Sequence, residues 1–153
     1  MKQQPNRRNS MTPIDEVLKL ENQMCFPLYA CARKVTGLYT PILKPLGLTY
    51  TQYIVLLVLW EEDNITVGEL CRKLYLDNGT ITPLLKKLEE HGYVVRERSK
   101  VDERVVTVRL TTEGAKLKDR AAEIPWQVGS CVKLTPEEAK TLYGLLYKIL
   151  EKI

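Results

Sequence analysis

The sequence predicts a mainly α-helical protein with one small β-hairpin, and three observations support that prediction. Two amphipathic segments lie between Thr66 and Glu90, separated by a polar turn at residues 75–79. Two strand-like runs, 93–98 and 104–110, come next and flank a charged turn. The capping-box spacing of Thr66 and Glu69 marks the start of the first helix. This order of helix, turn, helix and hairpin predicts a winged helix-turn-helix.

Length and composition limit the remaining choices. The 153 residues suffice for one domain with a moderate core, and 44% hydrophobic with 27% charged residues is an ordinary soluble balance. The net charge is only +4, so a nucleic-acid partner depends on where the charge lies. No apolar run reaches membrane-spanning length, and the polar N-terminus lacks a signal-peptide core. We therefore expect a cytoplasmic protein with no membrane partner.

The cysteines are few and widely spaced. Cys25, Cys31, Cys71 and Cys131 form no C-x-x-C pair, and the chain has a single histidine. Structural zinc sites need clustered thiolates or imidazoles, so we expect neither a metal nor another cofactor.

The N-terminal part combines a polar tail with a long helix. Residues 1–11 have little to bury and are expected to be disordered. Thr12 and Pro13 are typical of a short helix start. A long helix is then expected to reach Leu43, with Cys25 in its opening turn. A thiol in that position feels the positive end of the helix dipole, which favours the thiolate.

The remaining elements place a core helix before the hairpin module and helices after it. Thr49 and Gln52 form a capping box before a helix that is apolar on nearly every side. A charged helix is expected from Thr111 to about Glu123, followed by a break at Ile124-Pro125 and a connection at 125–134. Thr135 and Glu138 open a last helix with more apolar surface than one neighbour can cover, which predicts a homodimer. We assign 12–48 and 112–153 to a helical dimerisation region and 49–111 to the winged helix-turn-helix domain.

Polar and basic side chains gather on the second helix of the module and on the hairpin. Hydroxyls and helix N-termini suit phosphates and base edges, and an arginine at a hairpin tip can enter a narrow minor groove. A merely solvated basic surface is the alternative. The candidate DNA-binding residues are Asn78, Thr80, Thr82, Lys86, Lys87, Arg96, Arg98, Lys100, Asp102 and Arg104, with Arg109 on the basic fringe of the hairpin.

Two stretches resemble a known family. The turn and helix at residues 76–89, with Asp102-Glu103-Arg104, resemble the MarR family of transcriptional regulators. Within that family, residues 20–30 around Cys25 resemble the organic-hydroperoxide-resistance regulators, the OhrR branch. Pro27 departs from the ordinary helix former expected there.

The resemblance implies a redox sensor. The peroxide-sensing cysteine falls on Cys25, and the tyrosines that hydrogen-bond its thiol fall on Tyr29, Tyr39 and Tyr50, the latter two reaching over from the partner subunit. The minor-groove arginine falls on Arg104, oriented by Asp102. The implied function is a non-enzymatic, homodimeric repressor that binds double-stranded DNA at an inverted-repeat operator. It releases that operator when an organic hydroperoxide oxidises Cys25.

The other cysteines receive different expectations. Two-cysteine members of the branch carry a resolving cysteine in the region of Cys131, which pairs with the sensor of the other chain. Capping of Cys25 by a small cellular thiol is the alternative. Cys31 and Cys71 match no family site and are expected in or near the core.

Three other functions stay open at this point. A reversible phenolic ligand, bound between the DNA lobes and the dimer helices, would replace the thiol switch. A thiol peroxidase would use Cys25 with a nearby cation, for which Arg33 is a weak candidate. A pure protein-interaction dimer would show no salt-dependent affinity for DNA.

Overall fold

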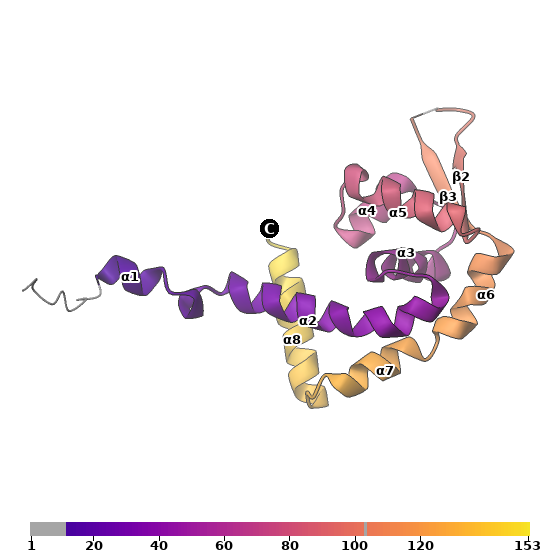
Figure 1. Ribbon diagram of the computed structural model, residues 1–153. Coiled ribbons are helices and arrows are strands. Elements are labelled where there is room, and N and C mark those ends of the chain that lie inside the picture. Colours follow the sequence, from indigo (N-terminus) through magenta and orange to yellow (C-terminus); the bar gives the residue numbers. More distant parts are fainter. Residues whose placement is uncertain (1–11, 103) are drawn as a thin grey trace, which may run out of the picture. The chain divides into compact units, whose positions relative to one another are not determined.

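The computed structural model describes residues 12–102 and 104–153, and the predicted tail at 1–11 lies outside the described residues. The fold is mainly helical with a small antiparallel sheet, as predicted (Figure 1). Its elements are α1 (Pro13–Val17), η1 (Leu20–Asn22), α2 (Cys25–Leu43), η2 (Lys44–Leu46), α3 (Tyr50–Glu61), β1 (Ile65–Thr66), α4 (Val67–Leu74), α5 (Asn78–Glu90), β2 (Val94–Arg98), β3 (Val106–Leu110), α6 (Thr112–Ala121), α7 (Ile124–Cys131) and α8 (Pro136–Leu150). Two compact units divide the chain, one ending at Gly37 and one running from Leu38 to Ile153.

The helix starts are set by local hydrogen bonds that the sequence encodes. Thr49 accepts a hydrogen bond from the backbone N–H of Gln52, whose side-chain oxygen accepts one from the backbone N–H of Thr49 at 2.9 Å. The same reciprocal capping box opens α4 at Thr66 and α8 at Thr135. Each box satisfies amide groups that a helix start leaves unpaired. All three predicted capping boxes are confirmed.

Helix α3 forms the centre of the core in the larger unit. Its Val55, Leu56 and Leu59 are at most 1% exposed. They join buried side chains from the helix-turn-helix and the sheet, which are Leu70, Ile81, Leu85, Leu88, Val94 and Val108. Burial of one such side chain contributes about 1.5–3 kcal/mol. The helix that the sequence predicted to be apolar on nearly every side is therefore the core helix.

The sheet has three strands in the order β1-β3-β2, so β2 is an edge strand. The hairpin register pairs Val94 with Leu110, and Val108 is buried while Arg109 is exposed. The exposed position of Arg109 agrees with its predicted place on the basic fringe of the hairpin. Strand β1 was missed, because two residues are too few for a periodicity and only pairing of Ile65 with Val108 makes them a strand.

Two boundaries differ from the predictions. Helix α5 begins at Asn78 rather than Thr80, because the Asp77 side chain caps it from the preceding position. The connection predicted at 125–134 is largely helical, because helix α7 occupies Ile124–Cys131. Ile124 and Val128, one turn apart, are buried against the core, and Pro125 lies in the first turn, where proline is tolerated.

A close contact fixes α6 against the hairpin module. The indole Nε1 of Trp60 donates to the backbone oxygen of Gly114 at 2.9 Å. A Cβ atom on Gly114 would lie 2.0 Å from the backbone oxygen of Tyr93, so only glycine fits at this crossing. Helix α6 therefore leaves the module in a fixed direction.

The N-terminal unit buries little by itself. Ile14, Val17, Leu18 and Met24 are exposed there. Among the described residues, no single helix is long and apolar enough to span a membrane; residues 25–46 with α3 would suffice by length and composition only as a pair bent by 76°. The predicted division at residues 48 and 112 stays a prediction.

Candidate functional site

Helix α5, the second helix of the helix-turn-helix, begins with a network of short side chains. Asp77 accepts from the backbone N–H of Thr80 at 2.8 Å and from the Thr80 hydroxyl at 3.0 Å. These hydrogen bonds hold the pKa of the Asp77 carboxyl below its usual range. The Thr82 hydroxyl donates to the backbone oxygen of Asn78 at 2.7 Å. Asn78, Thr80 and Thr82 are all exposed, so their side chains are accessible to a partner.

Cys71 supports this helix start from α4. Its Sγ donates to the side-chain oxygen of Asn78 at 3.5 Å. Burial raises the pKa of the Cys71 thiol, and the Asp77 carboxylate raises it further, so the thiol keeps the proton that it donates. The expectation that Cys71 lies near the core is confirmed, because it is half-buried against the core cluster.

The wing consists of strands β2 and β3 and the turn between them. Two arginine–glutamate pairs, which were not predicted from the sequence, hold it in place. The guanidinium of Arg96 donates to Glu89 Oε2 from Nε at 3.0 Å and from Nη2 at 2.6 Å. Arg109 donates to Glu97 Oε1 at 3.1 and 2.8 Å across the hairpin. Asp102 accepts from the backbone N–H of Arg104 at 3.0 Å, which shapes the wing turn before its arginine.

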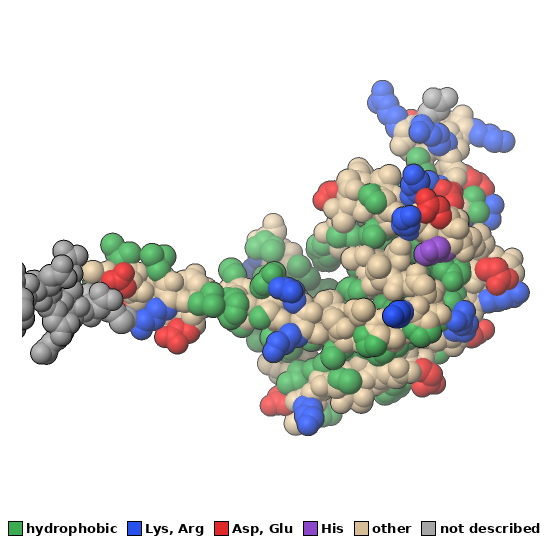
Figure 2. Space-filling view, in the orientation of Figure 1, with side chains coloured by type: hydrophobic (Ala, Val, Ile, Leu, Met, Phe, Trp, Pro, Cys, Tyr) green, Lys and Arg blue, Asp and Glu red, His purple; other side chains and the backbone are tan. Residues whose placement is uncertain are grey.

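An open groove lies between α4, α5 and the wing. Figure 2 shows Lys and Arg side chains (blue) gathered around the wing and the neighbouring helix. The residues that line the groove are Thr66, Val67, Gly68, Asn78, Thr82, Leu85, Arg96, Arg98, Arg104, Val105 and Val106. Three arginines beside a helix start make this groove suitable for phosphate oxygens.

The other predicted DNA-binding cations lie at the edges of this surface. Lys86, Lys87 and Lys100 are exposed. Lys87 forms an ion pair with Glu90 at 2.8 Å, one turn along the same helix. Such exposed pairs contribute little to stability and exchange readily for other partners.

Cys25 is the first residue of α2 and is exposed, in the opening turn where the sequence placed it. Tyr29 follows one turn later. Arg33 donates from Nη1 to the Tyr29 hydroxyl at 3.2 Å, with its guanidinium carbon 5.6 Å from the ring centroid. The sequence reading missed this role of Arg33, although its spacing of four residues from Tyr29 could have indicated it.

Tyr39 and Tyr50, which the resemblance placed near the thiol of the partner subunit, pack against each other within one chain. Their ring centroids are 4.8 Å apart, and Tyr53 lies 5.8 Å from Tyr39. Burial raises the pKa of all three hydroxyls, so they remain hydrogen-bond donors at neutral pH. Tyr53 was not among the tyrosines predicted to lie near the sensor thiol.

The remaining thiols are free. Cys131 is exposed at the last residue of α7 and donates from Sγ to the backbone oxygen of Gln127 at 3.4 Å. The expectation that Cys31 lies in or near the core is wrong in this structure, because Cys31 is exposed. It lies on the part of α2 before Gly37, in a unit in which no described residue is buried.

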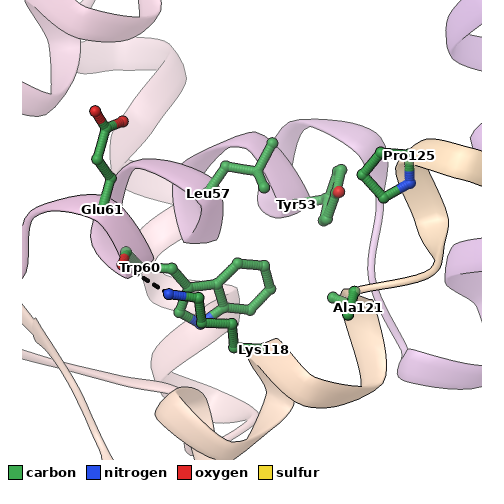
Figure 3. Close-up of a pocket in the computed structure, with 8 residues that line it drawn as sticks. Tyr53, Leu57, Trp60, Glu61, Lys118, Ala121 and Pro125 are labelled. Atoms are coloured by element: carbon green, nitrogen blue, oxygen red, sulfur yellow. Dashed lines mark hydrogen bonds between the residues drawn. The ribbon is translucent and has the colours of Figure 1, made fainter.

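A pocket of about 420 Å³ opens between α3 and the α6–α7 segment (Figure 3). Its walls are mostly apolar, with Trp60 and Leu57 from α3 facing Ala121 and Pro125. Lys118 adds one cation, which donates to the backbone oxygen of Trp60 at 3.3 Å. Pockets of this size and lining suit small amphipathic molecules.

The recognition helix, its capped start and the basic wing define a winged helix-turn-helix DNA-binding protein. Residues 37–121 match the family described as transcriptional regulator SarA/Rot. An organic hydroperoxide resistance transcriptional regulator of Bacillus subtilis is 46% identical over 136 residues, which are 89% of this chain and 92% of that protein. The chain therefore belongs to the MarR-type family of DNA-binding transcriptional regulators that includes SarA and Rot.

Solved structures place it in the same family. Reduced AbfR bound to DNA is 37% identical, with a TM-score of 0.75 and coverage of 91% of this chain and 96% of that chain. AbfR comes from Staphylococcus epidermidis, and its disulfide form is 36% identical, with a TM-score of 0.64 and coverage of 90% and 96%. Apo MarR of Escherichia coli is 30% identical, with a TM-score of 0.65 and coverage of 84% and 96%.

Proposed function

We propose that this regulator is a cytoplasmic homodimeric repressor that binds an inverted-repeat operator and leaves it when an organic hydroperoxide oxidises Cys25. Residues 49–111 read the DNA, and 12–48 with 112–153 form the dimer. The observation that carries the proposal is the exposed Cys25 at the first residue of α2, in a chain 46% identical to an organic hydroperoxide resistance regulator. The relative's name supplies the oxidant class.

Oxidation at this position explains a switch in chemical terms. The thiolate attacks the terminal peroxide oxygen, the O–O bond breaks, and an alcohol leaves after protonation, so that Cys25 becomes a sulfenic acid. The hydroxyls of Tyr29 and, from the partner, Tyr39 and Tyr50 donate hydrogen bonds to the thiolate. The new polar oxygen then disturbs this packing. One oxidant is consumed per thiol, so the protein is a sensor and not an enzyme.

On the DNA side, we assign roles from exposure and chemistry. Asn78, Thr82 and Lys86 face the major groove and its phosphates, and Arg104 enters the minor groove at the wing tip. Thr80, Lys87, Arg98 and Lys100 add phosphate contacts around them. Asp102 holds the backbone at Arg104.

The decisive test compares Cys25→Ser with Cys31→Ser, because both thiols are exposed on α2. Each protein is bound to DNA from the region flanking its own coding sequence, and cumene hydroperoxide is added. We expect Cys31→Ser to be released like the wild type and Cys25→Ser to stay bound. If Cys25→Ser were released at the same oxidant concentration as the wild type, Cys25 would not be the sensor.

We further propose that Cys131 of the partner resolves oxidised Cys25 as a disulfide. The exposed position of Cys131 and the existence of a disulfide form of AbfR support it. The Cys131 thiolate attacks the sulfenic sulfur, a disulfide forms and water leaves. Non-reducing electrophoresis should show a linked dimer that Cys131→Ser abolishes. A linked dimer in that variant would assign the resolving role to another cysteine of the chain, and no linked dimer in the wild type would leave a small cellular thiol as the resolving agent.

A reversible phenolic ligand is the second candidate, and the pocket beside Trp60 favours it (Figure 3). Lys118 could pair with a phenolate or carboxylate there. Titration of the Cys25→Ser variant with salicylate, followed by DNA release, tests for a ligand switch without the thiol. Release of that variant by salicylate would support the ligand switch, and no release by salicylate would leave only the thiol switch.

A further inference from the structure

One ion pair joins the two parts of the module that face DNA. Glu89 lies in the last turns of α5, and Arg96 lies in the middle of β2. Besides the two side-chain hydrogen bonds, the backbone N–H of Arg96 donates to Glu89 Oε1 at 3.1 Å. Both carboxylate oxygens are therefore used, one by the backbone of the wing and one by its side chain.

The backbone contact has a structural reason. Strand β2 lies at the edge of the sheet, where every second N–H points away from its only neighbour, β3. Glu89 supplies the acceptor that the missing strand would have provided at Arg96. The carboxylate thus fixes the position of β2 along the axis of α5. The two hydrogen bonds from the guanidinium, at 3.0 and 2.6 Å, fix the orientation of β2 relative to that helix.

The neighbouring ion pairs have no such reach. Lys87 and Glu90 lie one turn apart on α5, and Glu97 and Arg109 face each other within the hairpin. Neither pair connects α5 to the wing. In the Glu89–Arg96 pair the side chains are 37% and 29% exposed, so solvent screens it less than the Lys87–Glu90 pair at 62% and 45%.

We propose that Glu89 and Arg96 are positioning residues, which set the wing against the recognition helix so that Arg104 and the start of α5 engage DNA together. Arg96, which the sequence reading placed among the DNA contacts, acts through Glu89. The inference rests on DNA binding by α5 and the wing. It adds Glu89, whose charge has the same sign as that of the DNA phosphates. An acidic side chain on a DNA-binding module normally weakens binding by repelling phosphates.

The two possible roles of Arg96 predict opposite changes in DNA affinity when Glu89 is removed. If Arg96 served as a phosphate contact, removal of Glu89 would free its guanidinium and remove a negative charge, so affinity would rise. If the pair positions the wing, removal of Glu89 lowers affinity even though the module becomes more positive. The loss should be about 10- to 100-fold, the effect of losing a hydrogen bond to a charged group.

The experiment measures binding of the full-length dimer to a duplex that the wild type selects from a random-sequence pool, by fluorescence anisotropy at several salt concentrations. Glu89→Ala is compared with Glu90→Ala, which removes the same charge from the adjacent position of α5. Circular dichroism and urea unfolding verify that each variant is folded at the assay temperature. We expect Glu89→Ala to bind more weakly and Glu90→Ala to bind as well as the wild type or better.

A second comparison distinguishes positioning from a general loss of structure. Arg104→Ala should weaken wild-type binding strongly but should have a much smaller effect in the Glu89→Ala background, because a displaced wing no longer delivers Arg104. The double variant Glu89→Ala/Arg96→Ala should bind no worse than either single variant. The exchange Glu89→Arg with Arg96→Glu should recover part of the affinity.

The outcomes separate the two layers of the argument. Glu89→Ala with undiminished affinity, or additive effects of Glu89→Ala and Arg104→Ala, would overturn the positioning role alone. A wild-type protein that selects no duplex would overturn the DNA-binding function and this inference with it.

Discussion

Helices α5 and α8 look alike in the sequence but differ in what covers them. Both start at a capping side chain, Asp77 or Thr135, and both carry apolar residues at helical spacing. In α5 the apolar face is buried, with Leu85 only 1% exposed, whereas α8 contains no buried residue and Leu145 is 54% exposed. Helical periodicity therefore identifies a face but not its neighbour. The face of α5 is covered by its own chain, and we infer that a second copy covers the face of α8.

The largest expected effect is on the covered side. Leu85→Ala should lower the free energy of unfolding by about 2–5 kcal/mol, because a fully buried side chain leaves a cavity behind. Urea unfolding measures it. A cost below about 1 kcal/mol would show that the α5 face is less tightly packed than its burial indicates.

A pair of glycines extends the comparison. Gly114→Ala should destabilise the protein by about 1–3 kcal/mol, since the new Cβ meets the Tyr93 oxygen at 2.0 Å. Gly144→Ala in α8 meets nothing within 4 Å in one chain and should stabilise that helix by up to about 1 kcal/mol. Thermal unfolding of both variants tests this. If Gly144→Ala destabilised the dimer instead, the partner would pack directly on Gly144.

The uncovered face should matter for assembly. Leu145→Ala should raise the dimer dissociation constant about tenfold, which corresponds to about 1.4 kcal/mol. This is less than the free energy that a fully buried leucine side chain contributes, because the Leu145 side chain is only partly covered. Sedimentation at several concentrations measures it. Val101→Ala, at the 98% exposed wing tip, is the matched control and should leave the constant unchanged. An unchanged constant for Leu145→Ala would place the dimer contact elsewhere.

The smallest expected effect is a pH dependence on the α5 side. Hydrogen bonds from Arg96 hold the pKa of Glu89 below its ordinary value of 4.5 in the folded protein. The ionised pair therefore contributes stability that is fully present above that value and is lost as the pH falls through the lower folded-state pKa. Because both side chains are partly exposed, the contribution should stay below about 1 kcal/mol.

Glu89→Gln provides the measurement. Its free energy of unfolding should fall less steeply below about pH 4.5 than that of the wild type. Glu113→Gln, which removes an exposed carboxylate from the Glu113–Lys116 pair on α6, controls for the loss of one negative charge. Parallel curves for Glu89→Gln and the wild type would show that the pair adds nothing to the pH dependence.

Much of the fold was predictable because its signals are local. The capping boxes at Thr49, Thr66 and Thr135, the apolar core helix and the alternation of Val108 with Arg109 each depend on residues a few positions apart. The same holds for Cys25 at the start of a long helix. Local hydrogen bonds and periodicity depend only on residues close in the sequence, so they can be recognised without knowing the tertiary neighbours.

Tertiary structure decided the rest. Strand β1 exists only because Ile65 pairs with Val108, and α7 is a helix because Ile124 and Val128 find the core. Arg96 was assigned to DNA because its residue type suits phosphates, but the fold brings Glu89, seven residues earlier, into contact with both its backbone and its side chain. Residue type determines which partners a side chain can have, and only packing determines which partner is within reach.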